Sequence, residues 1–169
     1  TLVPALPAFA QGCEDRSQNH EARIAACDQA FAMATDAEAA AIALAFKGEA
    51  LRLLARFDEA EAVLKDALGF MPENGWIWIE LGNLAYDRGD PADALAHYSA
   101  ALAVEDSADA WANRAEVWWQ FRSGERCNAD ADEALRIAAD FAYANEIKGR
   151  CLIDLGRAEE ALEYFDRAI

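Results

Sequence analysis

The sequence predicts an all-α protein in which antiparallel helix hairpins stack into a solenoid. Similar residues recur every 33 or 34 positions along most of the chain, a period typical of repeated helix hairpins. The nine glycines and four prolines are sparse, and several stand where turns are needed. Abundant alanine gives the segments between them a high helix propensity.

Four sets of positions share the same offsets of 34, 33 and 34 residues, which is the main sign of a repeat. One set is Gly48, Gly82, Ala115 and Gly149. The others are Ala60, Ala94, Cys127 and Ala161; Leu64, Tyr98, Ala131 and Phe165; and Ala67, Ala101, Ala134 and Ala168. Small residues are expected in such sets because a larger side chain would hold the paired helices apart.

The clearest hairpin is the segment 78–101, WIELGNLAYDRGDPADALAHYSAA. Gly89 ends its first helix, and Asp90 and Pro91 begin the second as N-cap and first helical residue. Ala94 and Tyr98 then fall on one face of that second helix.

With this pattern the chain resembles the tetratricopeptide (TPR) repeat family over about residues 41–169. The family pattern is carried by Trp78, Leu81, Gly82, Ala94, Tyr98 and Ala101. The resemblance implies a right-handed TPR superhelix. Departures are the basic residues Lys47, Arg114 and Lys148 in place of leucine, and Cys127 in place of alanine.

Helices are expected near 37–54, 57–70, 74–88, 91–104, 108–122, 126–138, 142–155 and 158–169, after a partial unit near 19–34. They form four repeats at about 41–74, 75–107, 108–141 and 142–169, the last incomplete. Turns inside hairpins are expected at 56–58, Gly89, 123–124 and Gly156. The chain ends within a helix and has no initiator Met, which favours a piece of a longer protein.

The first ten residues, TLVPALPAFA, are apolar and end in the small-x-small pattern of a signal-peptidase site. They are interpreted as the remnant of a secretory signal, so that Gln11 begins the mature chain and the protein is exported to a bacterial periplasm. The alternative is a frayed apolar terminus of a cytosolic protein. No stretch approaches the roughly 18 apolar residues needed to cross a bilayer.

Export would allow disulfides among the four cysteines. The segment around Cys13 and Cys27 resembles the N-terminal part of exported bacterial TPR proteins, in which a cysteine in a polar loop precedes an Ile-x-Ala-Cys helix. We therefore expect a Cys13–Cys27 disulfide that makes residues 11–40 a stapled cap and partial repeat, contributing about 3 kcal/mol. Cys127 and Cys151 are either a second disulfide or two small buried side chains.

The net charge of −16 argues against nucleic acid and anionic membrane surfaces as partners. It indicates a solvated, self-repelling surface or, alternatively, a basic partner. No catalytic site, cofactor or metal site is expected. The two histidines, His20 and His97, have no oriented nucleophile, and no phosphate loop or ligand-like Cys and His spacing is present.

In the TPR family the first helix of each repeat lines a concave groove that binds peptides or helices of partner proteins. Carried over by position, this face holds Ile42, Ala45, Glu49, Arg52, Trp76, Ile79, Asn83, Tyr86, Asp109, Ala112, Glu116, Trp119, Tyr143, Glu146, Arg150 and Ile153. The partner-binding residues predicted among them are Trp76, Asn83, Tyr86, Glu116, Trp119, Tyr143 and Arg150. Aromatic side chains of this kind often form binding hot spots.

Three tryptophans, Trp78, Trp111 and Trp118, fall at packing positions, and Trp119 cannot share the face of its neighbour Trp118. Trp119 is therefore expected outside the core. Family members that bind chaperone tails use lysine at the positions of Ala45, Ile79 and Ala112, which disfavours that function.

The sequence thus predicts a non-catalytic scaffold or adaptor that binds a protein or peptide, basic or rich in aromatic residues, in its groove. Two alternatives stay open. One is a structural solenoid that self-associates through its uncapped C-terminal repeat, and the other is an accessory TPR domain of a larger envelope complex or enzyme.

Overall fold

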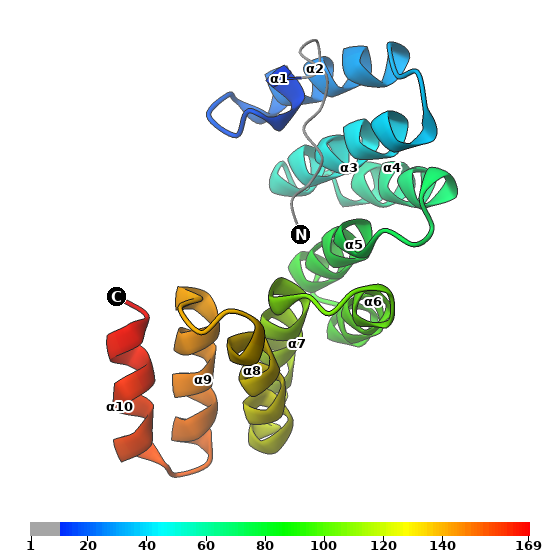
Figure 1. The fold of residues 1–169 in the computed structure, drawn as a ribbon. Coiled ribbons are helices and arrows are strands. Elements are labelled where there is room, and N and C mark those ends of the chain that lie inside the picture. Colours follow the sequence, from blue (N-terminus) through cyan, green and yellow to red (C-terminus); the bar gives the residue numbers. More distant parts are fainter. Residues whose placement is uncertain (1–10) are drawn as a thin grey trace. The chain divides into compact units, whose positions relative to one another are not determined.

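A computed structural model describes residues 11–169, and all regular secondary structure within this range is α-helical (Figure 1). The chain divides after Gly89 into two compact units, which are described in turn. The expected signal remnant at residues 1–10 lies outside the described range.

The first unit contains the stapled N-terminal segment and the first hairpin. Helix α2 packs against α3, α3 and α4 form an antiparallel hairpin, and α5 packs on both of them (Figure 1). The short α1 contacts α2 and α3. The helices are α1 (Gln11–Glu14), α2 (His20–Ala32), α3 (Ala37–Leu53), α4 (Phe57–Phe70) and α5 (Gly75–Arg88).

The second unit contains one leading helix and two hairpins. Helix α6 packs against α7, the pairs α7–α8 and α9–α10 form hairpins, and α9 also contacts both α7 and α8. Contact between successive first helices, here α7 and α9, is what builds a continuous face from them. The helices are α6 (Pro91–Val104), α7 (Ala108–Gln120), α8 (Gly124–Ile137), α9 (Ala142–Asp154) and α10 (Ala158–Arg167).

The helix ends follow the expected turn chemistry, with two corrections. Gly89 and Gly156 adopt the left-handed conformation at the hairpin turns, with φ of 84° and 75°. The equivalent positions are Ala55 and Arg122, both at φ 56°. The expected turns at 56–58 and 123–124 were therefore placed too late, since Phe57 already begins α4 and Gly124 already begins α8.

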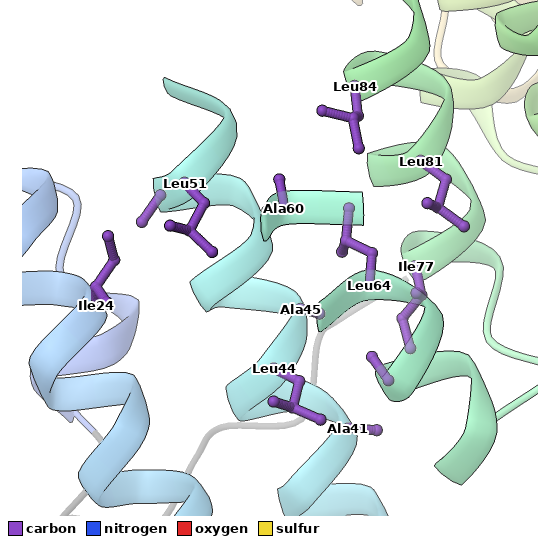
Figure 2. Close-up of a cluster of buried hydrophobic side chains, with 12 residues drawn as sticks. Ile24, Ala41, Leu44, Ala45, Leu51, Ala60, Leu64, Ile77, Leu81 and Leu84 are labelled. Atoms are coloured by element: carbon purple, nitrogen blue, oxygen red, sulfur yellow. The ribbon is translucent and has the colours of Figure 1, made fainter. Parts of the chain in front are cut away.

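The core of the first unit lies between its helices (Figure 2). Ile24 of α2, Leu51 of α3, Leu64 of α4 and Ile77 of α5 are all buried in it. Gly48 permits this packing, because a β-carbon there would lie 2.5 Å from Cγ of Leu64.

The same close approach occurs in the second unit. A β-carbon on Gly149 would lie 2.5 Å from Cε1 of Phe165. At the equivalent position of the preceding hairpin, Ala115 carries that methyl group, and there the facing residue is the small Ala131. Glycine thus stands opposite a large side chain in two hairpins, and alanine stands opposite a small one in a third.

Two disulfides are present, Cys13–Cys27 in the first unit and Cys127–Cys151 between α8 and α9 in the second. The second pair is thus bonded, which the sequence left open. Among the described residues, no helix is long and apolar enough to cross a membrane.

Candidate functional site

Five side chains from α7 and α9 meet on one face of the second unit: Glu116, Trp119, Tyr143, Glu146 and Arg150. We call them the α7–α9 cluster. The guanidinium carbon of Arg150 lies 5.0 Å from the centre of the Trp119 ring, and Nη1 of Arg150 is 3.8 Å from Oε1 of Glu116. Nη2 of Arg150 pairs with Glu146, and the hydroxyl of Tyr143 donates a hydrogen bond to Glu116.

Helix periodicity places these residues together. Glu116 and Trp119 are three residues apart on α7, while Tyr143, Glu146 and Arg150 follow at spacings of three and four on α9. Because α7 and α9 are in contact, the two faces join. The spacing predicted from the sequence is therefore sufficient to form the cluster once the helices stack.

The cluster is partly open to solvent. The side chains of Arg150 and Glu116 are 34% and 22% exposed. Ile153, one turn beyond Arg150 on the same stripe of α9, is 48% exposed. The face thus combines aromatic, acidic and apolar groups that a second molecule can reach.

The remaining predicted residues lie on α5 of the first unit. Trp76 is half-buried, with its ring centre 4.8 Å from that of Phe46. Nδ2 of Asn83 donates to Oε1 of Glu80 at 3.4 Å, and Tyr86 is half-buried. The structure thus brings together four of the seven predicted binding residues, while these three belong to another unit.

The predicted groove face on α3 is occupied by the chain itself. Ile42 and Phe46 are buried in a cluster with the disulfide of Cys13 and Cys27, so this part of α3 is not open. Ala45 is also buried, as are Ile79 on α5 and Ala112 on α7. Because these side chains are buried, they do not form the open lining of a groove that was expected from the sequence.

Glu49, also predicted on the groove face, is instead buried and forms ion pairs within the protein. Its carboxylate accepts a hydrogen bond at 2.8 Å from the fully buried Arg23, and it pairs at 3.0 Å with Arg16. Nε of Arg23 also donates to the carbonyl of Cys13 at 3.4 Å. The disulfide segment is therefore tied to α3 by charge as well as by apolar contact.

Glu80 is a buried carboxyl that the sequence did not single out. Burial, with the nearby Glu49 charge, raises the pKa of Glu80 to about 7, although Arg52 and other neighbours act in the opposite direction. Nε of Arg52 lies 3.6 Å from Oε2 of Glu80. The repeat contained a partial signal, because two of the three equivalent residues, Phe46 and Ile147, are apolar and buried, whereas the third is the half-buried Asn113.

Each of the three basic residues that replace leucine pairs with an aspartate, which lies on α2 in one case and on α8 in the other two. Lys47 pairs with Asp28, and Lys148 pairs with Asp132. Arg114 donates two hydrogen bonds to Asp130, at 2.7 and 2.9 Å, and lies over the Trp111 ring. Long side chains with buried stems and paired ends thus fill the space of the leucine.

The tryptophans assigned to the core are only partly buried. Trp78, Trp111 and Trp118 lie at the margins of apolar clusters, and the indole N–H of Trp78 donates to the carbonyl of Pro72 at 3.1 Å. Trp119 is half-buried too, but the guanidinium group of Arg150 lies over its ring in the α7–α9 cluster.

No group of three or more histidine, cysteine or acidic side chains within residues 11–169 has an arrangement that could hold a metal ion.

Two models of the tetratricopeptide repeat match residues 49–117 and 128–169, which together make up more than half of the chain. The chain belongs to the tetratricopeptide-repeat family. TPR proteins are non-catalytic scaffolds that generally bind other proteins, which agrees with the expectation that this chain is not an enzyme.

Several curated relatives are similar in sequence. Protein FlbA of Caulobacter vibrioides is 33% identical over 121 residues, 69% of this chain and 20% of FlbA. Hsp70-Hsp90 organizing protein 3 of Arabidopsis thaliana is 32% identical over 100 residues, 52% of this chain and 18% of that protein. The chain therefore spans about a fifth of the length of these relatives.

Solved structures show the same TPR fold. A thermophilic TPR protein of Thermus thermophilus superposes with a TM-score of 0.77 at 17% identity, covering 95% of this chain and 87% of that one. MamA of Desulfovibrio magneticus gives a TM-score of 0.70 at 17% identity, covering 97% and 95%. At this identity the likeness establishes the all-helical TPR solenoid and nothing about ligands.

Proposed function

We propose that this TPR chain is an exported adaptor that binds an extended segment of another protein across α7 and α9, the first helices of the repeats in its second unit. The α7–α9 cluster carries the proposal, because two successive first helices present Glu116, Trp119, Tyr143 and Arg150 together on a reachable face. The helices are folded in advance, so binding requires little ordering of the receptor.

Aromatic side chains in such a position commonly dominate binding energy. Trp119 offers a flat apolar surface, and Glu116 and Glu146 offer carboxylates to a basic or hydrogen-bonding partner. Trp76, Asn83 and Tyr86 on α5 form a separate candidate surface in the first unit. The positions where tail-binding family members carry lysine hold the buried Ala45, Ile79 and Ala112, which disfavours a chaperone-tail ligand.

Export to the bacterial periplasm is a separate part of the proposal. Two disulfides support it, since such bonds persist in oxidising compartments and are rare in the cytosol. The test is thiol alkylation of the protein in intact cells, followed by mass measurement. Export predicts no label on any cysteine before reduction, and labelled Cys13 or Cys27 would contradict it.

Binding is tested by site-specific photo-crosslinking in cells that produce the protein naturally. A benzophenone amino acid at Ile153 places the probe beside the cluster without altering it, and the same amino acid at the exposed Ala129 of α8 is the matched control. A distinct protein captured only from position 153 supports the adaptor. Self-adducts alone, or equal capture from both positions, contradict it.

A further inference from the structure

The α7–α9 cluster already holds a guanidinium group, that of Arg150. This group lies over the Trp119 ring and is flanked by carboxylates of Glu116 and Glu146. A planar cation above an indole, with carboxylates at its edges, is the arrangement in which an arginine side chain binds most favourably. The surface therefore has the chemistry of an arginine site.

Glu116 has a second contact that does not involve Arg150. The hydroxyl of Tyr143 donates to one oxygen of Glu116, while the other oxygen faces Arg150 at 3.8 Å. The carboxylate is thus oriented by α9 whether or not Arg150 occupies the site. Such prior orientation lowers the ordering cost of binding a second guanidinium.

Arg150 itself is held less firmly. Its side chain is 34% exposed, and keeping a long arginine chain in one conformation costs conformational entropy. Ion pairs that remain accessible to water contribute little to stability. An incoming cation can therefore replace Arg150 at small cost, and Arg150 can turn into solvent.

Charge favours a basic occupant. The cluster contains two carboxylates and one guanidinium, on a chain of net charge −16. A second cation at this face would balance the remaining negative charge, whereas an acidic ligand would meet Glu116 and Glu146 first. The repulsion of acidic segments adds selectivity.

We propose that the α7–α9 cluster binds an arginine side chain of the partner segment, and that Arg150 is an internal competitor which the partner's arginine displaces. This inference rests on the proposed function, because it names the chemistry recognised at the same surface. Arginine is preferred to lysine there, since a compact ammonium cannot stack on Trp119 while meeting a carboxylate along its edge.

Direct titration with a minimal ligand tests the inference. N-acetyl-arginine methylamide is added to the ¹⁵N-labelled protein, and the indole N–H signal of Trp119, assigned with Trp119→Phe, reports binding. If Arg150 occupies the site nine-tenths of the time, Arg150→Ala tightens the apparent Kd about tenfold. Arg150→Lys should tighten it less, because lysine still competes.

Three controls separate this mechanism from a general charge effect. Arg126→Ala removes another arginine that lies over a tryptophan, Trp118, and should leave the titration unchanged. Glu116→Gln added to Arg150→Ala should abolish the gain. The neutral citrulline analogue should not shift the Trp119 signal. Circular dichroism verifies that each variant keeps its helices.

Two results would overturn the inference: Arg150→Ala binding the arginine ligand no more tightly than the wild type, or the citrulline analogue binding equally well. If photo-crosslinking at Ile153 nevertheless captures a partner, the adaptor function stands and only the arginine preference fails. If the arginine titration succeeds while crosslinking captures nothing, the failure belongs to the proposed function.

Discussion

Substituting Gly149 by alanine tests the close packing of the hairpins. The new methyl group would lie 2.5 Å from Cε1 and 2.7 Å from Cζ of Phe165, far inside contact distance, so the half-buried ring or its helix would have to move. Overpacking of this kind costs about 1–3 kcal/mol. Alanine also gains up to about 1 kcal/mol of helix propensity over glycine. We expect a net loss of about 1–2 kcal/mol in the free energy of unfolding.

A double-mutant cycle isolates the cause. With Phe165→Ala in the background, the steric conflict is gone and Gly149→Ala should stabilise by up to about 1 kcal/mol. The coupling energy is then about 1–3 kcal/mol, within the range measured for residues in contact. The chain contains this combination naturally, since Ala115 faces the small Ala131.

The assay is urea unfolding followed by circular dichroism and tryptophan fluorescence, which must coincide for a free energy to be defined. Gly69→Ala is the matched control, because nothing lies within 4 Å of its added methyl group. It should be neutral or slightly stabilising. Additivity of Gly149→Ala and Phe165→Ala within about 0.5 kcal/mol would refute the steric reasoning.

Three further predictions concern stability. Ala55→Gly should stabilise the protein by about 0.5–1 kcal/mol in urea unfolding. Alanine at φ 56° is strained by about 1–2 kcal/mol, and the greater freedom of glycine in the unfolded chain offsets part of the relief. A loss of stability would contradict this. The pKa of Glu80 is raised to about 7, so the native state binds its proton more tightly than the unfolded state, and stability falls as pH rises from about 4.5 to 7. As the pH rises over this range, the free energy of unfolding of Glu80→Gln should increase relative to that of the wild type by up to about 3 kcal/mol. A difference that does not change with pH would refute the shift in pKa. Replacing both Cys13 and Cys27 by alanine should lower the free energy of unfolding by about 3 kcal/mol and increase amide hydrogen exchange in α3. Unchanged exchange in α3 would show that the disulfide is not needed to keep the N-terminal segment packed on Ile42.

The sequence determined the architecture because the relevant signals are local and repeated. Helix bounds follow from capping residues and turns within a few positions of each end, so most predicted ends agree with the structure within two residues. The 33- to 34-residue offsets similarly identified the small residues at close approaches. Helix ends and repeat offsets can be read without knowing contacts between distant residues, since each hairpin forms within one repeat.

The tertiary structure decided which positions on the first helices are open. Repeat spacing assigns Ile42 and Trp119 alike to the groove face, yet it cannot reveal that the disulfide segment covers α3, because that cover comes from residues 13–30 folding back on the hairpin. The burial of Glu80, the Cys127–Cys151 bond and the position of Arg150 over Trp119 likewise depend on side chains from different helices. Spacing along one helix fixes the face on which a residue lies, whereas its neighbours, and hence its charge and accessibility, are set only when helices distant in the sequence come into contact.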